Sequence, residues 1–471
     1  MFKSILCGET LPQDNIHAVS VSIPTFKDVI AYEEGKNTLI TRGYPRFVLH
    51  PYLKEMTYFL KEKYFIKDTQ EIVIVSSEKF AKIITQKYNI QSNINFKEDF
   101  GIVLVDKDSS NLKKVLSFIQ HVGCNLSSRY AENFLFKNSL IKFLQEEKLE
   151  NKDSAFKIII STLASAYNQP EKNICLTTSG MNSIYAVLQG LQDIRRGRDT
   201  IVQLGWLYLD CTNVVKYYSK NSKVFYDVSN LKILEEYLQI QGDRVSAIIT
   251  EVPTNPLLQS VDLQRLRKLC DKYDIALVID ATFATPYNLD LKEYADVIVE
   301  SLTKFACGNA DVLMGCFILS ENSKYSIEEF TKYIDSPYIK DMQRLAIEIQ
   351  NYESRVKKIN KNKRELVRYL HQKDFIKKIY TSDLSGVISV TFNLPFDEVY
   401  DNLNFSKGPS LGTEFTLLMP YIYLAHYDLI KSKEGKKLLE KNSIPIDLIR
   451  ISVGVEDIED IKNEFDKLDL R

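Results

Sequence analysis

Two hydroxyl residues and a lysine stand at the end of an apolar run, in Ser301-Leu302-Thr303-Lys304. The run before them is Val297-Ile298-Val299, and a strand-like stretch from Val312 to Leu319 follows. A lysine amine held at a strand end can form a Schiff base with the aldehyde of pyridoxal phosphate (PLP), and neighbouring hydroxyls can hydrogen-bond its phosphate. The motif therefore predicts PLP chemistry at Lys304, provided that the surrounding elements supply the rest of a cofactor site.

Short apolar strand patterns alternate with helical patterns through the middle of the chain. Near-continuous apolar strands separated by helices indicate a parallel sheet that is buried on both faces. In such a sheet, ligands bind beyond the carboxyl ends of the strands. The predicted strands cover residues 174–178, 200–204, 223–227, 245–251, 275–280 and 297–300, and the predicted helices cover residues 179–191 and 261–273.

Polar residues stand at the carboxyl ends of several of these strands. Ser179-Gly180 opens a helix, which suits a phosphate at a helix N-terminus, although helix capping alone also explains a serine there. Asp280 ends an apolar strand, where a carboxylate can keep a pyridine nitrogen protonated; the alternative is a turn-forming aspartate. Glu251 and Asn255 follow another strand. Tyr208 could stack on the ring and act in proton transfer, or it could be an ordinary core or surface aromatic.

Composition narrows the class of protein. The 471 residues allow two or three domains. A net charge of -1 gives no sign of a nucleic acid or an acidic membrane as partner. No apolar run reaches the roughly 18 residues of a membrane helix, and the N-terminus lacks a signal-peptide pattern. The 7 cysteines form no C-x-x-C pair and the 5 histidines are scattered, which predicts reduced thiols, a cytoplasmic location and no metal site.

The order of the segments resembles the Cys/Met-metabolism family of fold-type-I PLP enzymes, which includes cystathionine gamma-synthases, cystathionine lyases, methionine gamma-lyases and homoserine sulfhydrylases. The resemblance is closest to the long, fungal-type cystathionine gamma-synthase-like branch, and it covers most of the chain, with only a loose match over residues 60–125. The matching segments are residues 17–25, 43–47, 127–132, 178–181, 251–257, 278–286, 301–304, 308–312, 410–416, 425–427 and 450–457.

The resemblance implies a fold-type-I PLP-dependent transferase of the α/β class, with a mostly parallel central sheet and helices on both faces. It also implies a smaller α+β C-terminal domain and an N-terminal arm with an α/β insertion. An added regulatory or interaction module is the alternative for the insertion. The expected divisions are an arm at 1–58, the insertion and connecting helices at 59–155, a PLP-binding large domain at 156–325 and a small domain at 326–471.

The resemblance also implies a role for each matching residue. Lys304 would carry the cofactor and shuttle protons, Asp280 would pair with the pyridine nitrogen, and Tyr208 would stack on the ring and take part in catalysis. Arg450 would clamp the substrate α-carboxylate, a task that suits a planar bidentate donor. The other implied cofactor contacts are Ser179, Gly180, Met181, Thr282, Ser301 and Thr303, and the other implied substrate contacts are Asn255 and Ser410.

The family takes a Tyr-x-Arg pair from a neighbouring subunit to bind the phosphate, and two segments compete for this task. Tyr44-Pro45-Arg46 keeps the tyrosine and lies where the N-terminal arm is expected, whereas Arg129 lies nearer to Ser179 in sequence. We favour Tyr44 and Arg46. Either choice predicts a homo-oligomer, a dimer or a tetramer, with active sites completed by the neighbouring subunit.

The implied activity is γ-replacement on an O-activated homoserine by a thiol such as cysteine, as in transsulfuration and methionine biosynthesis. The alternatives are β- or γ-elimination of the cystathionine or methionine lyase type, homoserine sulfhydrylase activity, and a non-catalytic degenerate relative. Departures from the family pattern at Leu209-Asp210, Ala281, Asn309 and Phe415 leave the acyl group, the thiol and the choice of reaction open. They remove none of the cofactor anchors, which argues against a degenerate relative.

Overall fold

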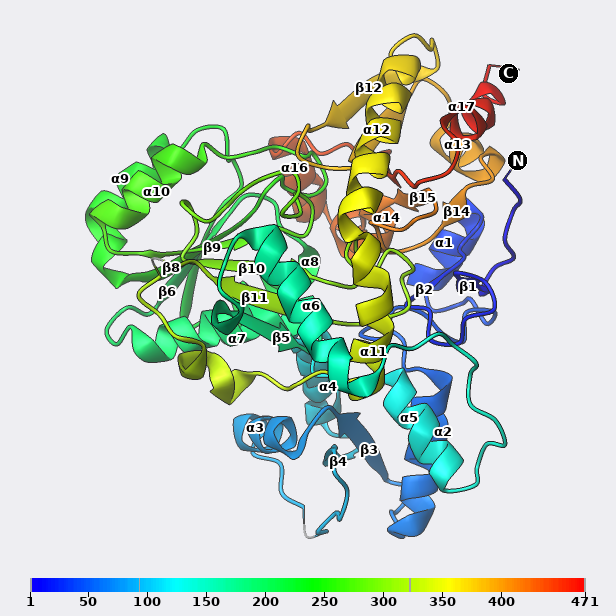
Figure 1. The fold of residues 1–471 in the computed structure, drawn as a ribbon, viewed down its shortest axis with the longest axis vertical. Coiled ribbons are helices and arrows are strands. Elements are labelled where there is room, and N and C mark those ends of the chain that lie inside the picture. Colours follow the sequence, from blue (N-terminus) through cyan, green and yellow to red (C-terminus); the bar gives the residue numbers. More distant parts are fainter. Residues whose placement is uncertain (1, 93, 322, 470–471) are drawn as a thin grey trace.

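A seven-stranded sheet lies at the centre of the computed structural model, which describes residues 2–92, 94–321 and 323–469. Its strand order is β5-β11-β10-β9-β8-β6-β7 (Figure 1). The neighbours from β10 to β7 run parallel, whereas β11 pairs antiparallel with β10 and with β5. The predicted mostly parallel sheet is confirmed. The strands are β5 (Ile174–Thr177), β6 (Thr200–Leu204), β7 (Asn221–Phe225), β8 (Val245–Glu251), β9 (Ala276–Asp280), β10 (Val297–Ser301) and β11 (Gly315–Leu319).

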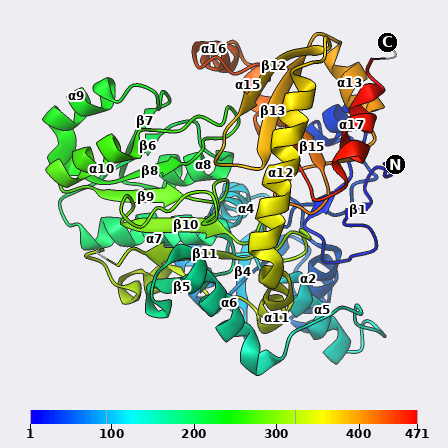
Figure 2. The ribbon, with the colours of Figure 1, turned by 45° about the horizontal axis from the view of Figure 1, so that its top comes forward.

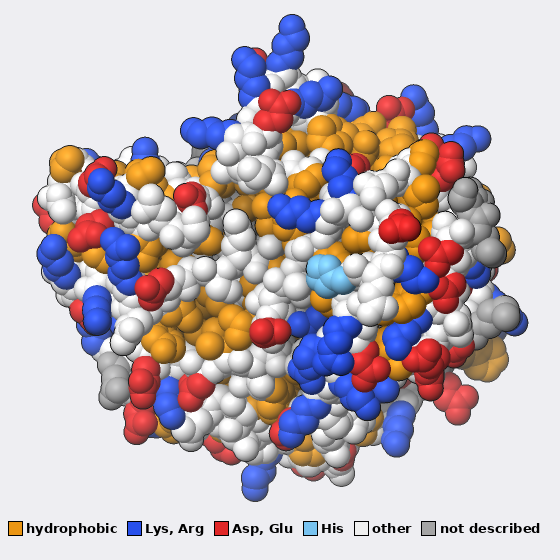
Figure 3. Space-filling view, turned by 90° about the horizontal axis from the view of Figure 1, so that it is seen from above, with side chains coloured by type: hydrophobic (Ala, Val, Ile, Leu, Met, Phe, Trp, Pro, Cys, Tyr) orange, Lys and Arg blue, Asp and Glu red, His pale blue; other side chains and the backbone are white. Residues whose placement is uncertain are grey.

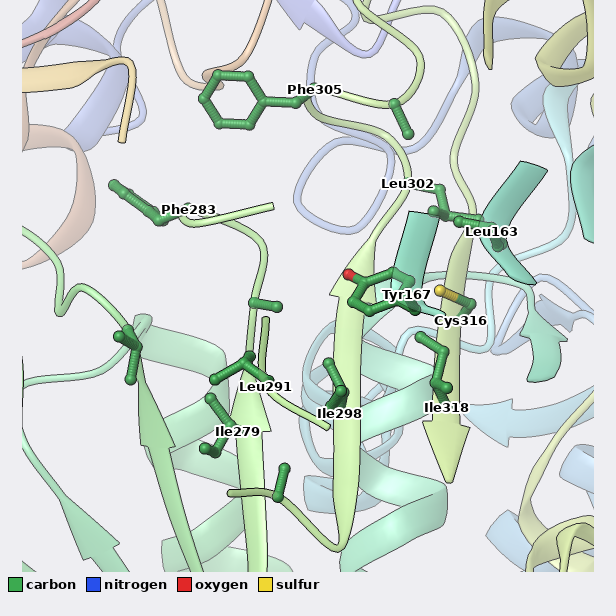
Figure 4. Packing of buried hydrophobic residues seen from close by; sticks show 14 of the residues in the cluster. Leu163, Tyr167, Ile279, Phe283, Leu291, Ile298, Leu302, Phe305, Cys316 and Ile318 are labelled. Carbon is green, nitrogen blue, oxygen red and sulfur yellow. The ribbon is translucent and has the colours of Figure 1, made fainter. Parts of the chain in front are cut away.

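Helices cover both faces of this sheet, because successive side chains of a strand point to opposite sides. On one face, Ile279 and Ile298 belong to the same buried cluster as Leu163 of α6 (Figure 4). On the other face, Val278 and Val299 pack with residues of α7 and α8. The helices around the sheet are α6 (Lys152–Tyr167), α7 (Gly180–Ile194), α8 (Leu209–Tyr218), α9 (Lys232–Gln241), α10 (Leu263–Lys272), α11 (Ile339–Glu348) and α12 (Tyr352–Leu370).

A five-stranded sheet of order β12-β13-β16-β15-β14 forms the smaller C-terminal domain, and α12 connects the two domains (Figure 2). Its Ile451 is buried with Leu366 of α12 and Phe465 of α17. The predicted α+β C-terminal domain is confirmed. Its elements are β12 (Ile376–Thr381), β13 (Val387–Phe392), α13 (Phe396–Asn402), β14 (Ser406–Lys407), β15 (Leu417–Pro420), α14 (Tyr421–Ala425), α15 (Tyr427–Lys431), α16 (Lys433–Lys441), β16 (Ile449–Ser452) and α17 (Ile458–Asp466).

The predicted insertion is a small α/β unit around the antiparallel pair β3 and β4. Side chains alternate here too: Val73 and Val103 pack toward α3 and α4, while Ile72 and Leu104 pack toward α2 and α5. Because α4 shares its buried cluster with α7 and α8, the unit packs on the helices that cover one face of the central sheet. Its elements are α2 (Pro51–Lys63), β3 (Gln70–Val75), α3 (Glu78–Tyr88), β4 (Gly101–Asp106), α4 (Ser110–Val122) and α5 (Ser128–Lys137).

The N-terminal arm packs on the C-terminal domain of its own chain. It contains the short antiparallel pair β1 (Thr10–Leu11) and β2 (Ser20–Val21) and the helix α1 (Phe26–Glu33). Ile23 and Val29 are buried in the same cluster as Phe465. The buried Tyr400 hydroxyl donates a 2.7 Å hydrogen bond to the carbonyl of Ile23.

The surface carries charges of both signs. Figure 3 shows Lys and Arg side chains interspersed with Asp and Glu, in keeping with the net charge of -1. Within residues 2–92, 94–321 and 323–469, every helix is too short or too polar to span a bilayer.

Candidate active site

The carboxyl ends of the central strands open into one cavity of about 140 Å³. Glu251 ends β8, Asp280 ends β9 and Ser301 ends β10, and all three line the cavity. The C-terminal domain adds Arg450 from β16. The residues that were predicted to hold the cofactor or the substrate and that line the cavity are Tyr44, Arg46, Ser179, Gly180, Met181, Tyr208, Asn255, Asp280, Thr282, Ser301, Lys304, Ser410 and Arg450.

Lys304 follows β10 and lies half-buried among these residues. Its Nζ donates a 2.9 Å hydrogen bond to Ser410 Oγ and lies 4.7 Å from the centroid of the Tyr44 ring. Burial lowers the pKa of the Lys304 ammonium, because desolvation disfavours its charged form. This moves the amine toward the neutral form that a carbonyl group needs from its nucleophile.

The Asp280 carboxylate is held by the turn that follows its strand. Its Oδ1 accepts a 2.9 Å bond from the Thr282 amide, and Thr282 Oγ1 accepts a 2.9 Å bond from the Ser301 amide. Thr282 therefore fixes the ends of β9 and β10 relative to each other. Burial raises the pKa of Asp280, so a cationic group facing it in the cavity would stabilise its ionised form.

The N-terminus of α7 faces the cavity at a point of close contact. Ser179 caps the helix, accepting a 3.1 Å bond from the Asn182 amide and donating a 2.9 Å bond to the Gly123 carbonyl. A Cβ on Gly180 would lie 2.7 Å from Ser301 Cβ, so only glycine fits here without displacing β10. A helix N-terminus beside a glycine and a hydroxyl is suited to a phosphate.

Arg46 reaches the same end of the cavity from the N-terminal arm. Its Nη1 donates 2.5 Å bonds to Asp210 Oδ2 and to the Gln120 carbonyl, and its Nη2 donates a 2.6 Å bond to the Tyr208 hydroxyl. Burial opposes the guanidinium charge, but Tyr208 and Asp210 outweigh this effect and raise the pKa of Arg46. A permanent positive charge therefore lies beside the Tyr208 ring.

Arg450 is a buried cation with neutral partners. It donates to the Ser410 carbonyl at 2.8 Å and to Asn255 Oδ1 at 3.3 Å. Its third described partner is the Met419 sulfur at 3.1 Å, and the Tyr421 ring centroid lies 5.2 Å from its Cζ. Burial lowers the pKa of Arg450 to about 10. An anion would stabilise this charge more than these neutral groups do.

Two residues considered for the phosphate lie elsewhere. Thr303 Oγ1 accepts a 3.1 Å bond from the Met314 amide and is absent from the cavity wall, because its side chain closes the turn between β10 and β11. Arg129 is buried in an ion-pair cluster with Glu147 and Asp341. The geometry therefore favours Tyr44 and Arg46 over Arg129.

Tyr44 and Arg46 were expected to reach the cavity from a neighbouring subunit. Both residues line the cavity of their own chain, because the arm packs on its own C-terminal domain.

Two buried carboxylic acids at the cavity had no role in the sequence prediction. Glu251 Oε1 accepts a 2.5 Å bond from the Tyr208 amide, while its Oε2 has no hydrogen-bond partner. Burial raises the pKa of Glu251 well above its ordinary value, and the adjacent Asp280 adds to this. Glu300 accepts bonds from Tyr167 at 2.5 Å and Tyr352 at 2.6 Å. The position of Glu251 at a strand end was the available signal; Glu300 lies within an apolar run and gave none.

The chemistry of these groups fits pyridoxal phosphate. A buried lysine amine can bind its aldehyde, a helix N-terminus and an arginine can bind its phosphate, and the carboxylate of Asp280 can face its ring nitrogen. Arg450, with its neutral partners, leaves a place for the carboxylate of an amino acid.

Comparisons with known proteins agree with this fit. The chain is 34% identical over 96% of its length to the L-2-amino-4-chloropent-4-enoate dechlorinase/desaturase of Streptantibioticus cattleyicolor, and covers 96% of that protein. It is 26% identical over 97% of its length to the cystathionine gamma-synthase of Neurospora crassa, again covering 97% of the relative. Yeast cystathionine gamma-lyase has the same fold, with a TM-score of 0.56 and 22% identity over 64% of this chain and 82% of its own.

The family assignment rests on most of the chain. Residues 153–468 match the family described as Cys/Met metabolism PLP-dependent enzyme. Pyridoxal phosphate is therefore the cofactor, and the chain is an enzyme of sulfur amino-acid metabolism by class. With the family match, the relatives and the geometry of Lys304, Asp280 and Arg450 in agreement, this chain belongs to the Cys/Met-metabolism family of PLP-dependent enzymes.

Proposed function

We propose that this enzyme removes a leaving group from Cγ of an α-amino acid and, in its synthetic direction, replaces that group with a thiol. The observation that carries the proposal is the position of Ser410 between Lys304 and Arg450. Its Oγ accepts from Lys304 Nζ at 2.9 Å and its carbonyl accepts from Arg450 Nη2 at 2.8 Å. A substrate whose α-carboxylate replaces the Ser410 carbonyl at Arg450 would have its Cα close to the Lys304 amine.

The residues of the chain divide the work. PLP, when bound, supplies the electron sink that makes the proton on the adjacent carbon acidic. Lys304 removes that proton from Cα and can carry it away because burial lowers the pKa of its ammonium. Arg450 and Asn255 orient the substrate carboxylate, and Ser410, through its hydrogen bond with Lys304, holds the amine on the side of the cavity where the substrate Cα would lie. Removal of a second proton at Cβ then lets the group on Cγ depart.

The cofactor contacts follow from the cavity wall. Asp280 would face the ring nitrogen, and Tyr208 would stack on the ring. The phosphate would lie between the N-terminus of α7, Ser301 and Arg46, where positive charge and hydroxyl donors meet. Thr303 would support this contact by holding the turn and not by binding the phosphate itself.

Elimination is the second candidate. The wall that would face the substrate side chain is largely apolar, with Phe47, Phe283, Leu411 and Leu424. Such a wall suits a small uncharged group on Cγ and offers little to hold a second amino acid. The 34% identical relative, named as a dechlorinase/desaturase, supports the same possibility. Homoserine sulfhydrylase activity is also a γ-replacement, but its nucleophile is small, so an apolar wall would not exclude it.

The two candidates are separated by their products. The purified holoenzyme is incubated with O-acetyl-, O-succinyl- or O-phosphohomoserine and with a 4-chloro amino acid, each with and without cysteine, and products are identified by mass spectrometry. Cystathionine supports γ-replacement by cysteine, and ammonia with a 2-oxo acid as the sole products overturns it. A failure to release any γ-substituent overturns the proposal as a whole. Lys304→Ala is the control and should lose both the yellow colour of bound PLP and all turnover.

We also retain, as proposals, a homo-oligomer and a cytoplasmic location. The 7 cysteines are free thiols, most of them buried, which suits a reducing compartment.

A further inference from the structure

The first 152 residues lie outside the family match, which begins at residue 153, yet they form part of the wall of the cofactor cavity. Tyr44, Arg46 and Phe47 of the arm line it directly. The insertion supports this wall from outside, since the Gln120 and Gly123 carbonyls at the C-terminal end of α4 accept hydrogen bonds from the lining residues Arg46 and Ser179. One chain therefore supplies both sides of the cavity.

Arg46 is fixed at this wall by groups from two different parts of the chain. Asp210 and Tyr208 belong to the matched family region, whereas Gln120 belongs to the insertion. Arg46 is only 7% exposed, and its partner Asp210 is fully buried. A buried, paired guanidinium holds its position. If Arg46 moved away, the buried Asp210 carboxylate would be left without a partner or solvent, which is energetically costly.

The end of α4 fits against the N-terminus of α7 with little room to spare. The Gly123 carbonyl accepts from Ser179 Oγ at 2.9 Å and from Thr178 Oγ1 at 3.1 Å. Gly123 has a φ of +72°, and a Cβ there would lie 2.1 Å from Ser179 Oγ. Phe118 and Val122 of α4 share a buried cluster with Tyr185 of α7. The insertion therefore holds in place the Thr178-Ser179 turn, which lies where the phosphate would bind.

The arm is attached to its own chain on both sides of the reactive lysine. The Val19 amide donates to the Ala310 carbonyl at 2.7 Å, in the loop after Lys304. Ser20 Oγ donates to the Pro409 carbonyl at 2.7 Å, across 389 residues and directly before Ser410. These contacts place the arm before it reaches Tyr44.

We infer that each chain completes its own cofactor site, with Tyr44 and Arg46 acting in cis. The arm and insertion take the place that the neighbouring subunit fills in the arrangement expected from the family resemblance. The inference rests on PLP as the cofactor and not on which reaction follows at Cγ. Assembly of chains into an oligomer does not change this result, because the site needs no residue from a second copy.

The test combines two defective chains. Arg46→Ala with one affinity tag and Lys304→Ala with another are co-expressed, and material that carries both tags is isolated by sequential purification. After dialysis, borohydride fixes the remaining PLP to lysine, and mass spectrometry measures how much the Arg46→Ala chain retains. Loss of hydrogen bonds from a buried charged group should weaken PLP retention about tenfold or more in Arg46→Ala alone.

The two arrangements predict opposite results for the mixed material. In cis, the Arg46→Ala chain loses PLP whether or not the Lys304→Ala chain is present, or no double-tagged material forms at all. In trans, the Lys304→Ala chain would donate its intact Arg46, and wild-type PLP retention by the Arg46→Ala chain would overturn the inference. Arg42→Ala is the matched control, since Arg42 lies in the same segment but outside the cavity, and it should retain PLP. Normal retention by Arg46→Ala alone would also overturn the assignment.

A second measurement needs no cofactor. Tyr427 Oη lies 3.3 Å from Glu34 Oε1 at the exposed contact between arm and C-terminal domain. A Glu34→Cys/Tyr427→Cys variant treated with a short bis-maleimide should form a link within one chain, seen by peptide mapping and by the unchanged chain mass on a denaturing gel. A covalent dimer that is absent from the Glu34→Cys and Tyr427→Cys single variants, which carry the same native cysteines, would instead show that the arm is exchanged between chains.

Discussion

Glu300 allows a quantitative prediction about stability. It precedes Ser301 on β10, is 1% exposed, and accepts hydrogen bonds from Tyr167 of α6 and Tyr352 of α12. Burial raises the pKa of Glu300 from 4.5 to about 7, although the two tyrosine hydroxyls oppose this rise. The native state therefore holds a proton on Glu300 over a pH range in which the unfolded chain has released it.

The sign follows from proton binding in the two states. Below pH 4.5 Glu300 is protonated in both the native and the unfolded state, and its stabilising effect is fully present. Between pH 4.5 and about 7 only the native state keeps the proton, so the free energy of unfolding falls as pH rises. Above about 7 both states are ionised and the fall ends. At 1.36 kcal/mol per pKa unit, the loss amounts to about 3 kcal/mol.

Glu300→Gln isolates this contribution, because glutamine has nearly the same shape and does not ionise. Urea unfolding of the wild-type and Glu300→Gln holoenzymes is compared from pH 4.5 to pH 8. We expect the stability difference between them to shift by about 3 kcal/mol in favour of the variant as pH rises. Glu353→Gln, at an exposed position of α12, is the control and should follow the wild type. A Glu300→Gln curve parallel to the wild type would refute the reasoning.

Three further variants test the site. Arg450→Lys keeps the charge but loses the planar pair of donors, so the KM of the amino-acid substrate should rise about 100-fold in steady-state kinetics. An unchanged KM would contradict the role of Arg450. Asp280→Asn should lower kcat by about 10²–10³ while PLP absorbance persists, because the charge beside the ring is lost; full activity would exclude that charge as important. Gly180→Ala places a Cβ 2.7 Å from Ser301 Cβ, and this overpacking should lower the free energy of unfolding by about 1–3 kcal/mol. The variant should also release PLP on dialysis, and normal PLP retention would contradict the close fit at Gly180.

The central sheet was predictable because its strands are uninterrupted apolar runs. Thr200–Leu204 and Val245–Glu251 were predicted with their observed bounds, since every residue in them is buried. The strand predicted at 223–227 lies at Asn221–Phe225 instead. It is an edge strand with exposed Asn221, Ser222 and Lys223, so its sequence carries little of the apolar signal. The proposed domain limits at residues 58, 155 and 325 stay predictions.

The site was predictable to the extent that parallel strands bring their ends together. Asp280 and Ser301 follow neighbouring strands, and the topology alone places both at one edge. Thr303 shows the limit of this argument, because its contact with Met314 depends on the turn geometry after β10. The position of the arm depends on contacts such as that of Ser20 with Pro409, which local periodicity does not encode.

The cationic side chains of the cavity have different partners, and this difference sets their tasks. Arg46 is charged and paired with Asp210, and burial moves Lys304 toward its neutral form. Arg450 keeps its charge beside neutral groups, which is unfavourable until an anion arrives. A substrate α-carboxylate therefore gains from relieving this buried charge as well as from its hydrogen bonds. That gain is the same for every α-amino acid. The apolar wall around the substrate side chain can therefore differ between relatives without loss of carboxylate binding, and this wall can determine whether replacement or elimination follows.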